Sequence, residues 1–254
     1  MTGLFQGMSY VLKGFSLITQ KGIRPFVAVP LLINILIFTG GIWLASSQIE
    51  RWMEHLLPSW LTWLEWLLWP LFIVVIFFAV FYTFTMLANI ISAPFNSLLA
   101  EQIEKRLNGL PVTEFQGFKS IPGLITRTFR SEASKLWYMA KWGILLILLT
   151  LIPGLNVISP IAWTIFGAWM LAIEYADYPM GNHELYFKDE LQTLKKHPTH
   201  ALGFGWILSL MTAIPVLNFL AMPVGVAGGT ALWVDELSKS HREGLNINLS
   251  PSRS

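Results

Sequence analysis

The sequence predicts an all-α integral membrane protein with two long transmembrane helices, two re-entrant (half-penetrating) helical hairpins and interfacial amphipathic helices. Three observations lead to this fold class: the charge-free run Trp66–Ala100, two later apolar runs that share a proline-centred pattern, and a composition that is 54% apolar and only 13% charged. As one helix, Trp66–Ala100 would rise about 52 Å, against roughly 30 Å of bilayer hydrocarbon. The chain therefore crosses a membrane with several helical turns to spare.

The composition also limits the chemistry. Twelve Trp and 17 Phe are typical of a lipid-embedded chain with aromatic anchors at the membrane surface. The absence of cysteine excludes disulfides, thiolate catalysis and cysteine-based metal centres. The net charge of +2 says little about partners, because its distribution matters more than its sum.

The first half of the chain divides at breaks in its apolar pattern. Residues 5–20 carry Lys13 as their only charge and are typical of a helix lying on the membrane surface. Gly22 allows a turn, and Pro25 suits the first position of a new helix. We expect one helical membrane domain over residues 1–243, beginning with the interfacial helix 5–20, a spanning helix 25–49, a loop 50–65, a spanning helix 66–107 and a partly interfacial helix 118–141.

The second half contains an internal repeat. Ile152-Pro153-Gly154-Leu155-Asn156 returns about 62 residues later as Ile214-Pro215-Val216-Leu217-Asn218. The stretch from Trp142 to the first proline would make only about 16 Å of helix, half the hydrocarbon thickness. We therefore expect residues 142–173 and 201–234 to form re-entrant hairpins that turn at these prolines. The alternative is two ordinary spanning helices in each run. The end of the chain, 244–254, is expected to be disordered.

The distribution of basic residues predicts the orientation of this multi-pass protein. Loop 50–65 holds one of the 17 Lys and Arg residues, and the other sixteen share the opposite side. By the positive-inside rule both termini are cytoplasmic and the loop is external.

No catalytic motif is found. The sequence has no H-E-x-x-H, no P-loop and no G-x-S-x-G. His183 with Glu184, and His197 with His200, are assigned to a polar loop over 174–200, where solvated histidines are a simpler account than a metal site. No Asp or Glu lies inside an apolar span, which argues against a carboxylate-coupled pump. We predict a protein that is not an enzyme, without catalytic residues, metal, cofactor, nucleic acid or ATP.

Polar residues within or beside the apolar runs are the candidates for a hydrated path. Such side chains either join helices by hydrogen bonds or line a passage for a small polar solute. Around Pro94 the two interpretations are about equally supported, and Glu101 with Lys105 is also the spacing of an ordinary helical ion pair. The candidate pore-lining residues are Asn34, Asn89, Ser92, Asn96, Glu101, Glu104 and Arg106.

The segment Gly22-Ile23-Arg24-Pro25 suits an anion. It places backbone N–H groups and a guanidinium at a helix N-terminus, and a guanidinium matches the oxygens of a tetrahedral oxyanion. The alternative is a basic flank that only fixes membrane orientation. On physical grounds alone this second interpretation is preferred.

Several short motifs, taken in order and spacing, resemble the CysZ family of bacterial inner-membrane sulfate permeases over nearly the whole chain. They are Gly22-Ile23-Arg24, Val29-Pro30-Leu31-Leu32-Ile33-Asn34, the segment Ser92–Glu101, the segment Trp169–Tyr175, Asp177-Tyr178-Pro179 and Met222-Pro223-Val224.

The resemblance implies uptake of sulfate for cysteine biosynthesis without ATP hydrolysis, with sulfite as a further candidate ligand. It also implies a homo-oligomer in membrane lipid, with two long spanning helices and two half-penetrating hairpins in each chain. It places sulfate at Gly22, Ile23 and Arg24. Relatives often carry a second Arg at the next position, where this chain has Pro25. The competing hypothesis is a membrane scaffold or accessory subunit of another transporter or enzyme complex.

Overall fold

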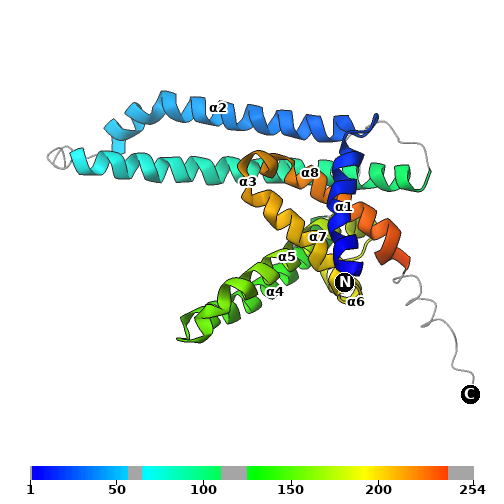
Figure 1. Ribbon diagram of the computed structural model, residues 1–254. Coiled ribbons are helices and arrows are strands. Elements are labelled where there is room, and N and C mark those ends of the chain that lie inside the picture. Colours follow the sequence, from blue (N-terminus) through cyan, green and yellow to red (C-terminus); the bar gives the residue numbers. More distant parts are fainter. Residues whose placement is uncertain (1, 57–64, 110–124, 240–254) are drawn as a thin grey trace, which may run out of the picture. The chain divides into compact units, whose positions relative to one another are not determined.

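The computed structural model describes residues 2–56, 65–109 and 125–239, which are helical apart from turns (Figure 1). The predicted tail 244–254 and the start of the predicted helix 118–141 lie outside these residues. Packing divides the chain into two compact units, residues 1–24 with 96–254 and residues 25–95, and each is described by itself. The elements are α1 (Thr2–Ile18), α2 (Arg24–Leu56), α3 (Glu65–Leu107), α4 (Ile125–Leu151), η3 (Leu155–Val157), α5 (Ser159–Asn182), α6 (Phe187–Lys196), α7 (Pro198–Ala213), α8 (Pro215–Leu232) and η4 (Trp233–Leu237).

The core of the first unit is built from α1, α5, α7 and α8, where α1 and α5 each pack against both α7 and α8 (Figure 1). Glycines allow these helices to approach backbone to backbone. A Cβ added at Gly203 would collide with the main chain of Leu4, and one added at Gly205 with the main chain of Ala168. Small residues at crossings are how helices pack closely where apolar side chains are not driven together by water.

The repeat predicted from the two proline patterns forms two helical hairpins. The helices α4 and α5 are joined by residues 152–158, which include the short turn η3, whereas α7 and α8 are joined by Ile214 alone. Gly154 has φ 89°, a conformation that suits glycine, and Pro215 occupies the first turn of α8. Apolar side chains at both turns are exposed, with Val157 and Val216 each 76% exposed.

Some predicted boundaries are wrong. The segment expected as a separate helix over 118–141 and the first hairpin arm that follows it are one continuous helix, α4, of 27 residues. Lys141 ends the charged stretch without interrupting the backbone, and the helix continues to the next proline. The eleven-residue arm on which the half-length argument rested is therefore not observed.

The expected polar loop over 174–200 is also wrong, because it contains the end of α5 and the whole of α6. Helix α6 has acidic residues in its first turn and basic residues in its last, which favours a helix through its macrodipole. Phe187 and Leu194 are its buried apolar residues. The predicted loop 50–65 is shorter than expected, since α2 continues to Leu56.

The second unit contains α2 from Pro25 onward and α3 up to Phe95. Large apolar side chains on both helices are exposed, among them Leu36 (71%), Trp43 (67%) and Trp66 (75%). A single copy thus leaves a broad apolar surface without cover. Lipid or another protein chain normally covers such a surface.

Candidate functional site

The turn between α1 and α2 is organised by the main-chain carbonyl of Gln20. This oxygen accepts hydrogen bonds from the N–H groups of Ile23 (3.2 Å) and Arg24 (3.3 Å). Gly22 directly precedes Ile23 and has φ 90°, a left-handed conformation that a residue with a side chain rarely adopts. The N–H groups of Ile23 and Arg24, which were expected to bind an anion, are thus already hydrogen-bonded within the turn. Among the described backbone hydrogen bonds, none involves the N–H of Gly22.

The three predicted sulfate-binding residues differ in accessibility. Ile23 is fully buried and anchors the turn, whereas Gly22 and Arg24 are exposed. The Nε of Arg24 donates a hydrogen bond of 2.5 Å to the carbonyl oxygen of Thr19, which folds the guanidinium back over the turn. The structure therefore places a cation and a free-lying glycine amide at one exposed turn.

Two of the predicted pore-lining residues pair within the second unit. The amide of Asn34 and the hydroxyl of Ser92 are 3.3 Å apart and link α2 to α3. Ser92 is only 2% exposed. Asn89 lies in α3, but its side chain is outside the described residues.

The remaining candidates belong to the first unit and each has a polar partner. Asn96 is nearly buried, and its Nδ2 donates to the hydroxyl of Tyr178 at 3.3 Å. Glu101 forms the ordinary i,i+4 ion pair with Lys105. The other two candidates bind across longer sequence separations: Glu104 Oε1 lies 2.8 Å from His183 Nε2, and Arg106 Nε donates to Gln20 Oε1 at 3.2 Å.

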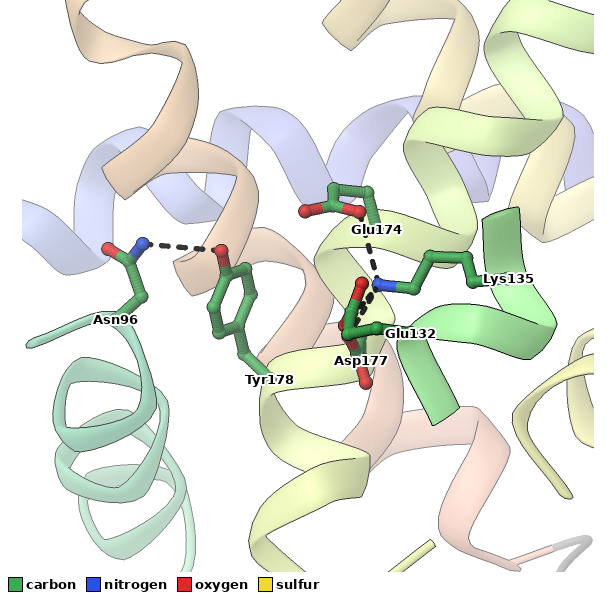
Figure 2. A network of polar contacts seen from close by, with 6 residues as sticks. All are labelled: Asn96, Glu132, Lys135, Glu174, Asp177 and Tyr178. Carbon is green, nitrogen blue, oxygen red and sulfur yellow. Dashed lines mark hydrogen bonds and ion pairs between the residues drawn. The ribbon is translucent and has the colours of Figure 1, made fainter. Parts of the chain in front are cut away.

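A charge cluster around the buried side chain of Lys135 was missed by the sequence analysis (Figure 2). The side chain of Lys135 is 8% exposed, and its Nζ lies 2.7 Å from Asp177 Oδ2 and 3.2 Å from both Glu174 Oε2 and Glu132 Oε1. The cluster ties α4 to α5, next to the contact between Asn96 and Tyr178. Asp177 was part of a motif quoted for the family resemblance, but nothing local to it indicated a partner 42 residues away.

Glu190 on α6 adds an unusual carboxyl group to this cluster. It is fully buried, and neither of its oxygens accepts a hydrogen bond from any residue that the structure describes. The pKa of Glu190 is raised to about 10, mainly by burial and also by the nearby Asp177 carboxylate, while Lys135 opposes the shift. With its pKa raised in this way, Glu190 is expected to be a neutral acid at pH 7.

His183 with Glu184, and His197 with His200, were considered as possible metal ligands. In the part of the chain that the structure describes, no group of three or more His, Asp or Glu side chains could hold a metal ion. His200 Nε2 instead lies 3.2 Å from Gln6 Oε1, and burial lowers the pKa of His197. The expected lack of metal and cofactor stays a prediction.

The fold and these sites define an all-helical membrane protein. Among the described residues three helical segments are long and apolar enough to cross a bilayer: Arg24–Leu44, Glu132–Leu151 and Pro215–Leu237. The run Trp66–Ala100 is only partly covered by described side chains, and the apolar stretch Trp69–Thr83 lies within it.

Comparison with known proteins identifies the family. Residues 10–223 match the EI24 family, described as sulfate transporter CysZ/etoposide-induced protein 2.4, and the chain belongs to this family. Three curated relatives are named sulfate transporter CysZ. The one from Pectobacterium atrosepticum is 42% identical over 90% of this chain and 84% of its own length. Those from Pseudomonas fluorescens (42%) and Salmonella typhimurium (43%) match over 92% and 90% of this chain and over 94% and 92% of their own lengths.

Proposed function

We propose that this protein is a sulfate permease of the bacterial inner membrane that admits sulfate for cysteine biosynthesis. The observation that carries the proposal is the match to relatives named as sulfate transporters, at 42–43% identity along nine-tenths of the chain. The class of protein agrees with it, because the chain is helical and has segments fit to span a bilayer. Transport proceeds through a channel or facilitator, without ATP.

The proposed sulfate site is the turn containing Gly22, Ile23 and Arg24. Its support is the exposed guanidinium of Arg24 beside Gly22, at the N-terminal end of α2, where the helix macrodipole favours an anion. Pro25 has no N–H to offer, so Arg24 contributes more of the binding than it would beside a second arginine. Sulfite, a smaller sulfur oxyanion, is a candidate for the same turn.

The proposed conduit is lined in part by polar side chains of α2 and α3. Its support at the cytoplasmic mouth is charge pairing, since Glu101 lies against Lys105 and Glu104 against His183. The ion pair with Lys105 cancels the negative charge of Glu101, which lowers the repulsion of a dianion. The proposed lining residues are Asn34, Asn89, Ser92, Asn96, Glu101, Glu104 and Arg106.

The proposed membrane arrangement has both termini in the cytoplasm and two hairpins that enter and leave on the same side. The exposed apolar side chains at the turns of both hairpins support insertion of these turns into the membrane. Cysteines introduced at Val157 and Val216 would test the arrangement with a membrane-impermeant reagent. Labelling from the external face would mean that the helices span, and protection from both faces would support re-entrance. The exposed apolar surface of α2 and α3 supports a homo-oligomer surrounded by lipid.

The deciding experiment is sulfate flux into liposomes that contain only the purified protein. Flux without nucleotide or partner supports the permease, and no flux through well-folded protein would favour the scaffold hypothesis instead.

For the binding site, Arg24→Ala should weaken sulfate binding by roughly ten- to hundred-fold, because a charge-assisted hydrogen bond contributes about 1.5–3 kcal/mol. Arg24→Lys should recover part of the affinity. Calorimetry on detergent-solubilised protein measures both, and wild-type affinity in Arg24→Ala would place the site elsewhere.

A further inference from the structure

Gln20 makes two different connections at the end of α1. Its main-chain oxygen accepts the N–H groups of Ile23 and Arg24 and thereby closes the proposed sulfate-binding turn. Its side-chain Oε1 accepts a hydrogen bond from Arg106 Nε at 3.2 Å, across 86 residues of sequence. One residue therefore shapes the turn and holds the guanidinium of Arg106 next to it.

Among the described residues, Arg106 forms no ion pair, because its partner Gln20 is neutral. Two carboxylates lie close by on α3, but Glu101 pairs with Lys105 and Glu104 pairs with His183. Arg106 is bound instead by the neutral amide of Gln20. A purely structural arginine usually gains its stability from a carboxylate, whereas an arginine held by an amide keeps its full positive charge for a ligand.

The turn by itself provides few donors for a dianion. The N–H groups of Ile23 and Arg24 are bonded to Gln20, and Pro25 has none. Arg24 and Arg106 each donate a hydrogen bond to a described residue through Nε only. The terminal nitrogens of both guanidinium groups therefore remain available for oxyanion oxygens, and these form the planar fork that suits such a ligand.

We propose that Gln20 is a positioning residue that brings Arg106 to the turn, so that sulfate is held by Arg24 and Arg106 together. The inference rests on the proposed function, namely that this turn binds sulfate. In this chain Arg106 then takes the role of the second cation that Pro25 does not supply. It also follows that the site prefers a dianion, because two guanidinium groups would contact the ligand.

The test compares variants by calorimetry with sulfate and with methyl sulfate, a monoanion that keeps the tetrahedral shape. Arg106→Gln should weaken sulfate binding by about ten-fold or more and methyl sulfate binding by less, because the second charge matters most for the dianion. Arg106→Lys should retain part of the sulfate preference. Lys195→Gln, which removes an exposed positive charge from α6, is the matched control and should bind both anions like the wild type.

Gln20→Ala distinguishes positioning from direct binding. It should weaken sulfate binding, and adding it to Arg106→Gln should cause no further loss, because both changes break the same connection. Thermal unfolding of each variant in detergent identifies any variant that fails to fold, and Arg106→Lys keeps the test valid if Arg106→Gln does. If Arg24→Ala weakens binding while the Gln20 and Arg106 variants bind like the wild type, this inference is overturned and the proposed function stands. If the wild type neither binds nor transports sulfate, the proposed function itself fails.

Discussion

Replacing the buried acid Glu190 with glutamine should stabilise the protein at neutral pH. Glu190 is fully enclosed between α6 and the Lys135 cluster, and its pKa is raised from 4.5 to about 10. Above pH 4.5 the unfolded chain releases this proton to water, whereas the folded protein keeps it until about pH 10. Unfolding is therefore increasingly favoured as the pH rises through this window, and the neutral amide of glutamine removes the effect.

The loss of folding stability that Glu190 causes at pH 7 depends mainly on the pKa of this side chain in the unfolded state. As long as the folded pKa lies well above 7, the loss equals the free energy of deprotonating the unfolded side chain, about 3 kcal/mol for 2.5 pH units. For a chain of this size such a change corresponds to a rise in Tm of about 6–12 °C. At pH 4.5 or below, the wild type and Glu190→Gln should unfold at nearly the same temperature.

The assay is thermal unfolding in detergent between pH 4.5 and pH 8.5, followed by the fluorescence of the 12 tryptophans. The quantity of interest is the difference in Tm between Glu190→Gln and the wild type at each pH, since other groups shift both proteins alike. Asp189→Asn is the control, because Asp189 is the exposed acid next to Glu190 in the same helix turn. It should be neutral or slightly destabilising, as an acid near a helix N-terminus is favourable.

A Tm difference that stays constant across this pH range would refute the reasoning. It would mean that Glu190 loses its proton at the same pH in the folded and unfolded chains. A destabilising effect of Glu190→Gln at pH 7 would also contradict it, because an ionised carboxylate bound to Lys135 would then be the native form.

Two further changes test the packing of the first unit. Lys135→Met should destabilise the fold by about 2 kcal/mol, because it leaves Asp177 without its cation at 2.7 Å, and a chemical unfolding series in detergent measures this. Gly205→Val should prevent the close approach of α7 to the main chain of Ala168 and abolish a cooperative unfolding transition, whereas Gly167→Val, where a Cβ meets open space, should unfold almost like the wild type. Equal behaviour of the two glycine variants would show that the crossing does not need a small residue.

Apart from the ion pair of Glu101 with Lys105, the connections of the candidate site could not be predicted from local patterns. Lys135 meets acids 39 and 42 residues away, and Arg106 meets Gln20 across 86 residues. Each of these residues, taken alone, is an ordinary charged or amide side chain on a helix. The turn Gly22–Arg24 was a candidate anion site because its glycine and arginine lie close together in the sequence, but the occupation of its amides by Gln20 depends on backbone geometry that composition does not report.

By itself the sequence determined the helical class, the membrane character and the breaks between helices at Pro153 and Pro215. These properties arise from local causes, namely apolar run length, missing charge and the backbone limits of proline and glycine. Only the tertiary structure decided that α4 runs unbroken from Ile125 to Leu151, that α6 lies inside the expected loop, and which charges compensate one another. The physical reason is that helix ends and ion pairs depend on packing against elements far away in the chain, which no local pattern encodes.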